Sequence, residues 1–127
     1  MTLFEKCLKA LKNDLVILSE EETKKVFDKM IHTFPITLWG RINWKNVKNF
    51  KKIVSINNID QFINPGKKEV YILWDEASLP AIKTDMKKLL NVIDDITAVS
   101  FDTWIYCPKD GWVIEFYHEG EITIGFV

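Results

Sequence analysis

The sequence has few of the residues that build the commonest catalytic and cofactor sites. Among 127 residues there are two histidines, two cysteines and five glycines. The glycines are scattered, so neither GxxxxGK[ST] nor GxGxxG occurs, and no phosphate- or dinucleotide-binding loop is predicted. No HExxH motif, clustered Cys/His set or spaced acidic loop indicates a metal site. The sequence therefore predicts a protein that uses no cofactor and no metal.

The sequence also lacks the marks of export and of membrane insertion. Cys7 and Cys107 lie far apart with no CxxC motif, which favours two free thiols in a reducing cytosol. No apolar run approaches the roughly 18 residues that a membrane-spanning helix needs. The first residues, MTLFEKCLKALKND, carry charges that interrupt the apolar stretch of a signal peptide. We expect a cytoplasmic protein in which residues 1–127 form a single domain.

Charge is present in balanced amounts but is unevenly distributed along the chain. Residues 1–68 carry a net charge of +6 and residues 69–127 a net charge of −7, within a total of −1. Unless the two halves interleave in the fold, they should create a strong dipole. An acidic face of this size would repel nucleic acid and attract a basic partner. Aromatic residues make up 13% of the chain, and they suit cores and interfaces equally well.

Periodicity predicts helices in the N-terminal half. The spacing of apolar residues indicates a helix over 3–12, and DLVILS (14–19) is a short strand or a buried connection. Ser19 with Glu22 forms a capping-box signature, which begins a helix that ends at Phe34-Pro35. Residues 36–66 mix helical and extended signals, with a possible bend at Gly40, and NPGK (64–67) predicts a turn.

The C-terminal half predicts an antiparallel meander. EVYILW (69–74) is a strand, and the spacing of Ile82 to Ile93 predicts a helix that Ser78 caps. Three strands follow at about 97–106, 112–118 and 121–126, joined by turns at PKDG (108–111) and at Glu119-Gly120. The expected fold class is α+β: an antiparallel β-meander in the C-terminal half with helices packed on one face.

Strand alternation sorts the meander into two faces. Cys107 is expected opposite Trp112, and a two-residue turn at Glu119-Gly120 would place His118 opposite Glu121. One face is then mostly aliphatic, and it contains Val99, Phe101, Thr103, Ile105, Ile114, Phe116 and Thr123. The second face is amphipathic, and it contains Ser100, Asp102, Trp104, Tyr106, Val113, Glu115, Tyr117, Ile122, Ile124 and Phe126. Either a helix of this same chain covers the second face, in which case its carboxylates need partners inside, or a protein partner does.

The same alternation divides the cluster of charges at the end of the chain. Glu115 points away from His118, because residues three apart on a strand lie on opposite faces. His118 and Glu121 would form a solvated pair at the rim of the hairpin. With Glu119 they are the residues of an alternative reading, a small hydrolase or nuclease, for which the sequence reveals neither a nucleophile nor a residue to orient the histidine.

Two further patterns are interpreted first as solvated surface residues. The pairs Asp75-Glu76 and Asp94-Asp95 could bind a metal, but such residues more often lie at the ends of helices and strands. The segment WKNVKNFKK, Trp44 to Lys52, mixes lysines with aromatic residues as a nucleic-acid-binding module does. The acidic half of the chain counts against that alternative.

Two stretches of the C-terminal half resemble a known family. They are VYILWDEASLPAIKTDMKKLL and DDITAVSFDTWIYCPKDGWVIEFYHEGEITIGF, with Trp-Asp before a helix, then Asp-Thr-Trp, then Glu-Phe-Tyr-His-Glu-Gly. The chain resembles here the small bacterial immunity proteins of contact-dependent growth inhibition and related polymorphic toxin systems. The resemblance covers about 69–127 and does not extend to residues 1–68.

The resemblance implies a non-enzymatic, cytoplasmic antitoxin that binds one cognate toxin domain, often a nuclease with a basic active-site cleft. It agrees with the acidic C-terminal half. The expected toxin-binding residues are Asp102, Trp104, Tyr106, Glu115, Tyr117, Asp75 and Glu76. Catalytic residues and metal ligands are not expected.

Overall fold

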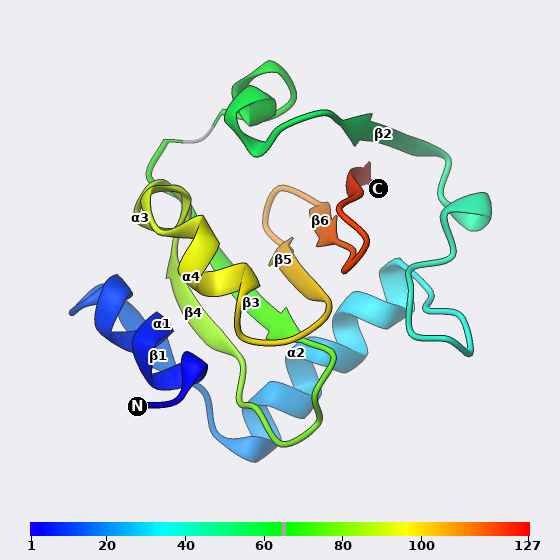
Figure 1. Ribbon diagram of the computed structural model, residues 1–127. Helices are drawn as coiled ribbons and strands as arrows, with labels where there is room; N and C mark the ends of the chain where they lie inside the picture. The colour runs from blue at the N-terminus through cyan, green and yellow to red at the C-terminus, as the bar shows by residue number, and fades with distance from the viewer. Residues whose placement is uncertain (65) are drawn as a thin grey trace.

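An antiparallel sheet forms the centre of the protein. The computed structural model describes residues 1–64 and 66–127, and Figure 1 shows its helices and strands. Within these residues the elements are α1 (Leu3–Leu11), β1 (Leu15–Ile17), α2 (Glu20–Thr33), η1 (Trp44–Asn46), β2 (Asn49–Ile53), η2 (Ile56–Gln61), β3 (Glu69–Trp74), β4 (Ile82–Asp85), α3 (Met86–Asn91), α4 (Ile93–Thr97), β5 (Thr103–Cys107), β6 (Trp112–Phe116) and β7 (Ile122–Phe126). The α+β class and the antiparallel meander β5-β6-β7 are confirmed.

The order of the strands mixes the two halves of the chain. The sheet of the described residues runs β1-β4-β3-β5-β6-β7-β2, and every neighbouring pair is antiparallel. The strands of the basic N-terminal half, β1 and β2, therefore form the two edges, and the strands of the acidic half lie between them. The halves interleave, so the charge asymmetry of the sequence does not separate into two ends of the molecule.

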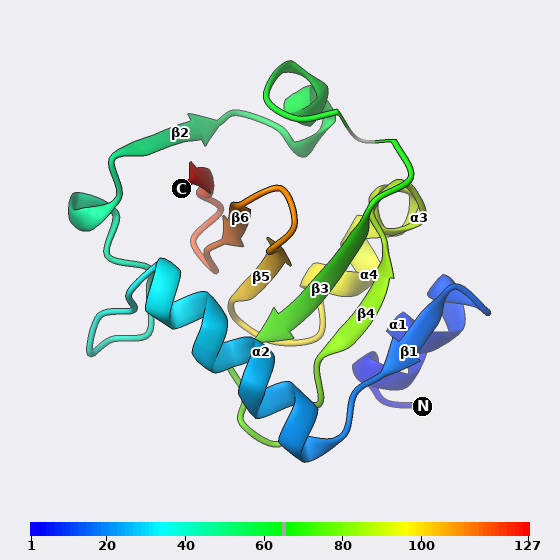
Figure 2. The same cartoon turned by 180° about the vertical axis from the view of Figure 1, so that it is seen from behind.

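Helices cover both faces of the sheet. On one face, α1, α3 and α4 contribute Cys7, Leu11, Met86, Leu89 and Ile96 to a core with the inward residues of the central strands. On the opposite face, α2 and the segment 34–47 pack over Leu73, Trp104, Tyr106 and Val113. Figures 1 and 2 show these two sides. The expectation of helices on one face holds for α1, α3 and α4, whereas α2 lies on the other side.

The local signals of the N-terminal half are confirmed. Ser19 and Glu22 form the expected capping box, in which the Ser19 hydroxyl accepts a hydrogen bond from the Glu22 N–H at 3.1 Å. The mixed segment 36–66 contains η1, β2 and η2, and Gly40 adopts a φ of +86°. The turn expected at 64–67 includes Pro65, which is outside the described residues.

The helix expected from Ser78 to Ile93 is wrong in its first part. Residues 82–85 form β4, which pairs with β1 on one side and β3 on the other. Ile82 and Thr84 are buried, while Lys83 between them is half-exposed, so the alternation of a strand operates here. Helix α3 begins only after Asp85, whose carboxylate accepts from the Lys88 N–H at 3.2 Å. The four-residue step from Ile82 to Met86 matched a helical spacing by coincidence.

The first strand of the meander begins later than expected. Residues 93–97 are helix α4, and β5 covers only Thr103–Cys107. The pairing of Cys107 with Trp112 is confirmed, and with it the sorting of β5 and β6 into faces. Phe101, expected in the aliphatic core, is instead 78% exposed.

The pairing expected for β7 is wrong by one residue. Phe116 pairs with Ile122, because the chain turns over residues 117–121, with the Tyr117 N–H bonded to the Glu121 carbonyl at 2.9 Å. A slip of one residue exchanges the two faces of a strand. Ile122, Ile124 and Phe126 therefore join the aliphatic core, while Thr123 and Gly125 lie on the second face.

Candidate functional site

Glu115 is the centre of a buried hydrogen-bond network on the second face. Its side chain is 1% exposed, and it lies on β6 between Trp104 and Thr123. Oε1 accepts from Arg41 Nε at 3.1 Å, from Arg41 Nη2 at 2.9 Å and from Trp44 Nε1 at 3.1 Å. Oε2 accepts from the Ile42 N–H at 2.8 Å and from Trp104 Nε1 at 3.1 Å. The expectation that a covered Glu115 requires partners inside the protein is confirmed.

Arg41 carries the positive charge of this network. It is the single arginine of the chain, and its planar fork makes two contacts with one carboxylate. Burial opposes its charge, but hydrogen bonds to and charges on Glu115 and Glu121 prevail, so the pKa of Arg41 is raised. Its Nη2 also contacts Glu121 Oε2 at 3.1 Å, and its guanidinium carbon lies 3.9 Å from the centroid of the Tyr117 ring. Arg41 thus joins the 34–47 segment to the β6–β7 hairpin.

The rings of Trp44 and Phe34 pack closely over Gly125 and complete the cover of the second face. A Cβ added at Gly125 would lie 2.5 Å from Trp44 Cζ3 and 3.5 Å from Phe34 Cε1. Glycine is therefore required where the Trp44 ring crosses β7. The segment 34–47 and helix α2 close this face, which settles the alternative that the sequence left open.

The closed face changes what the expected toxin-binding residues can do. Trp104, Tyr106 and Glu115 are at most 2% exposed, so they have little surface to offer a partner. Asp102 is 6% exposed and accepts from the His118 N–H at 2.8 Å, and Tyr117 lies half-buried under Arg41. Asp75 and Glu76 are exposed. A direct contact of any of these residues with a toxin stays a prediction.

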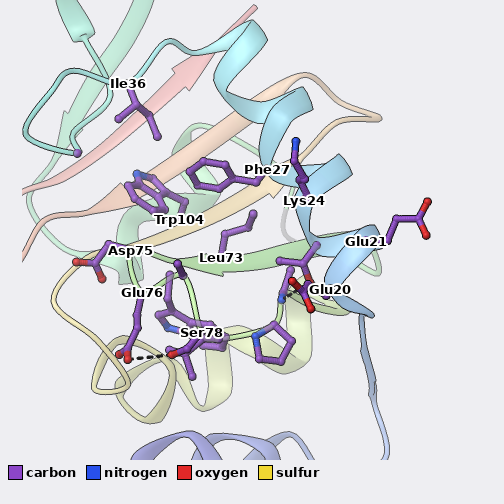
Figure 3. Close-up of a pocket in the computed structure, with 17 residues that line it drawn as sticks. Glu20, Glu21, Lys24, Phe27, Ile36, Leu73, Asp75, Glu76, Ser78 and Trp104 are labelled. Carbon is purple, nitrogen blue, oxygen red and sulfur yellow. Dashed lines mark hydrogen bonds between the residues drawn. The ribbon is translucent and has the colours of Figure 1, made fainter.

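An open groove of about 990 Å³ runs between α2 and the 75–80 loop. Figure 3 shows Phe27, Leu73 and Trp104 at its floor. Leu73 and Trp104 are each 2% exposed, so the apolar surface open to a partner comes mainly from the half-buried Phe27, Ile36, Leu79 and Pro80. Phe27 packs edge-on against Trp104, with ring centroids 6.2 Å apart. Ile36 and Gly40 of the 34–47 segment line one end. The floor is therefore built from three separate parts of the chain, and it is apolar.

Carboxylates border this groove. Glu20, Glu21, Asp75 and Glu76 line it together with one cation, Lys24, and the side chain of Glu21 extends outward (Figure 3). The Ser78 hydroxyl donates to Glu76 Oε1 at 3.0 Å. Asp75 Oδ1 accepts from the Ser100 hydroxyl at 2.6 Å and from the Asp102 N–H at 3.1 Å, so Asp75 also fixes the loop. The groove offers an apolar floor with an acidic rim, a composition suited to a partner that is basic and amphipathic.

The comparison with protein families gives the context for this surface. The family model described as "CdiI immunity protein EcoliA0-like" matches residues 1–125. The chain belongs to the CdiI immunity protein family. It is therefore an antitoxin that neutralises a toxin. The match includes residues 1–68, where the sequence alone suggested no resemblance, and a comparison with curated proteins gave no match.

At the end of the β6–β7 hairpin of this immunity protein, His118 has a carboxylate partner that the sequence did not reveal. Asp102 Oδ1 lies 3.0 Å from His118 Nδ1, so a carboxylate does orient this imidazole. His118 borders a cavity of about 400 Å³ together with Ser100. However, the Ser100 hydroxyl donates to Asp75, and Glu121 is engaged by Arg41 and by Lys52 at 3.5 Å. The arrangement holds the hairpin together, and the hydrolase alternative stays untested.

The basic segment of the immunity protein is divided between structure and surface. Trp44 donates to Glu115 and contacts Phe50, with ring centroids 5.7 Å apart. Lys51 and Lys52 lie exposed on the edge strand β2. A nucleic-acid-binding role for Trp44 to Lys52 stays an alternative hypothesis. Across the described ranges, 1–64 and 66–127, no helix is long and apolar enough to cross a membrane, and no cluster of three or more His, Cys, Asp and Glu residues is placed to hold a metal.

Proposed function

We propose that this protein neutralises its toxin by direct contact, without catalysis, and that the acidic groove between α2 and the 75–80 loop forms part of the contact surface. The observation that carries the proposal is the groove itself, with its apolar floor and the carboxylates of Glu20, Asp75 and Glu76 at its rim. Apolar contact supplies affinity at the centre of an interface, while complementary charge at the rim selects the partner and speeds association.

The toxin that fits such a surface is a nuclease. An enzyme that cleaves nucleic acid needs a cationic cleft to bind a polyanionic substrate. An acidic surface on the inhibitor complements that cleft, either by filling it or by binding beside it. We further propose that the encounter takes place in the cytoplasm, where nucleic acid is accessible to the toxin.

The test reverses two charges at the rim. Glu20→Lys with Glu76→Lys changes two exposed carboxylates that line the groove. The matched control, Asp94→Lys with Glu119→Lys, makes the same change in charge at exposed positions outside the groove, and Asp94, like Glu20, lies in the first turn of a helix. Binding is measured by surface plasmon resonance to the inactivated C-terminal domain encoded by the adjacent upstream gene.

We expect the rim variant to associate at least roughly tenfold more slowly than the control at low ionic strength. The difference should shrink as added salt shortens the Debye length to about 10 Å and below. Equal association rates for the two variants would refute the groove as the contact surface. A wild-type protein that fails to bind the domain, or leaves its nuclease activity unchanged, would refute neutralisation by direct contact.

A further inference from the structure

Two large apolar side chains that are almost fully exposed lie next to each other in one tight hairpin. Leu38 is 98% exposed and Trp39 is 81% exposed. Tryptophan side chains are highly buried on average in folded proteins. Adjacent exposed apolar residues commonly mark a binding surface. With so little contact area, neither side chain supports the core. The fold therefore gives no reason for tryptophan at position 39.

The hairpin that presents these residues is closed by hydrogen bonds at its base. The Thr37 N–H donates to the Arg41 carbonyl at 2.6 Å, and the Gly40 N–H donates to the Thr37 carbonyl at 3.0 Å. Below them, Ile36 and Ile42 form an isolated antiparallel bridge. Gly40 has a φ of +86°, a left-handed conformation that side chains other than glycine adopt only with strain. The tip therefore has one defined shape.

The buried Glu115 fixes this hairpin to the sheet. It accepts from the backbone N–H of Ile42 at 2.8 Å and from the side chain of Arg41 at 2.9 Å, the two residues that follow the tip. Both contacts are charge-assisted, and both go to a carboxylate that is 1% exposed. Figures 1 and 2 show the hairpin extending outward beyond the end of α2. Glu115 therefore acts on the tip as a positioning residue.

The hairpin lies at one end of the acidic groove, so a single partner can contact both. Ile36 and Gly40, on either side of the tip, line one end of the groove. A partner surface that lies over the groove, opposite Glu20 and Glu76, must be basic, and where it meets Leu38 and Trp39 it must be apolar. Tryptophan is enriched among the residues that dominate binding energy, and holding it in position before binding reduces the entropy lost on association.

We propose that Leu38 and Trp39 form a preorganised anchor that inserts into an apolar pocket of the toxin, and that this pocket has cationic surroundings. The inference rests on the proposed function, because the toxin is taken to bind by direct contact. It adds a second contact beside the groove, made by residues whose only evident role is recognition. It also assigns Glu115, which is itself buried, an indirect part in binding.

The experiment measures Kd for the inactivated upstream-encoded domain with Trp39→Ala and Leu38→Ala. The matched control is Phe101→Ala, because Phe101 is an aromatic residue of similar exposure, 78%, outside the hairpin and the groove. We expect Trp39→Ala to weaken binding roughly 30-fold or more, which is the level of an interface hot spot. Phe101→Ala should change Kd by less than about threefold.

Nitrogen-15 relaxation of the free protein tests the preorganisation. The backbone amides of Leu38 and Trp39 should have order parameters near 0.85, the value of rigid backbone. Arg41→Lys keeps the charge but loses the fork, so we expect these two order parameters to fall while those of β5 and β6 do not change. Values below about 0.6 in the wild-type protein would refute a preorganised anchor.

The outcomes separate this inference from the proposed function. Wild-type-like binding by Trp39→Ala, together with slow association of the groove variant, would overturn the anchor and leave neutralisation by contact standing. Failure of the wild-type chain to bind would overturn both. If sedimentation shows that the free protein is a dimer that Trp39→Ala dissociates, the tip is a self-association surface and the anchor is refuted.

Discussion

Replacement of Glu115 by glutamine should destabilise the protein strongly, although the two side chains have nearly the same shape. The carboxylate accepts five hydrogen bonds, three at Oε1 and two at Oε2. Glutamine can accept at only one of these two positions, because the other becomes an NH2 group that faces donors. The better orientation keeps the contacts at Oε1 and leaves the Ile42 N–H and the Trp104 indole N–H without acceptors.

The magnitude follows from these two losses and from the lost charge. A buried donor without a partner costs about 1–3 kcal/mol, and removing one member of a buried ion pair costs about 3–5 kcal/mol. The two costs arise in the same site and are not additive, so we expect Glu115→Gln to lower the free energy of unfolding by about 3–5 kcal/mol. With a urea m-value of about 2 kcal/mol/M, the midpoint of unfolding should fall by roughly 2 M.

The assay is equilibrium urea unfolding followed by tryptophan fluorescence, with Glu119→Gln as the control. Glu119 is exposed in the same hairpin, so its substitution should change stability by less than about 0.5 kcal/mol. A loss below about 1 kcal/mol for Glu115→Gln would refute the reasoning. A double-mutant cycle with Arg41→Met should give a coupling energy of at least about 1 kcal/mol, because the two residues share one network.

Two further predictions concern groups outside this network. Burial, and secondarily the charge of Asp95, raises the pKa of the Cys7 thiol to about 11, and burial likewise raises the pKa of the Cys107 thiol. We therefore expect both thiols to react with Ellman's reagent at pH 8 only after unfolding. Rapid labelling of the folded protein would contradict this prediction. Ser19→Ala should lower stability by about 1 kcal/mol through loss of the N-cap of α2. Hydrogen bonds from the Ser19 backbone and side chain lower the pKa of Glu22 from its ordinary value of 4.5. Because the pKa in the folded protein is depressed, the stability that these hydrogen bonds contribute is present above about pH 4.5 and is lost as the pH falls through the lowered pKa. Ser19→Ala keeps the backbone N–H and removes only the hydroxyl, so an NMR titration in which the Glu22 pKa does not rise at all would contradict the contribution of the Ser19 side chain.

The parts of the fold that the sequence predicts are those governed by neighbouring residues. The capping box of α2 and the alternation of β5 and β6 both rest on residues close together in the chain. The register of β7 depended on the length of one turn, and the assumption of two turn residues moved its whole apolar set to the wrong face. The apolar alternation of Ile122, Ile124 and Phe126 matches that of Trp112, Ile114 and Phe116, and this match would have given the correct register.

The candidate site was predictable only in part, because it depends on contacts between distant segments. Arg41 and Glu115 are 74 residues apart, and nothing local connects them. A signal was present: the chain has one arginine, and a carboxylate predicted among Trp104, Tyr106 and Tyr117 required a cation. The exposure of Leu38 and Trp39 could not be inferred, because the segment around them mixed helical and extended signals.

The long separation between Arg41 and Glu115 also has a consequence for biosynthesis. The ribosome releases the N-terminal half first, including Arg41, Trp44 and the edge strand β2, whose partner β7 is synthesised last. Until β6 and β7 emerge, the segment that holds the Leu38-Trp39 hairpin has no Glu115 to accept from its buried donors, and only part of the sheet on which it packs. A newly made chain therefore acquires the hairpin in its final position only when its last strands are in place, so protection from toxin should lag behind synthesis by the time that these strands take to dock.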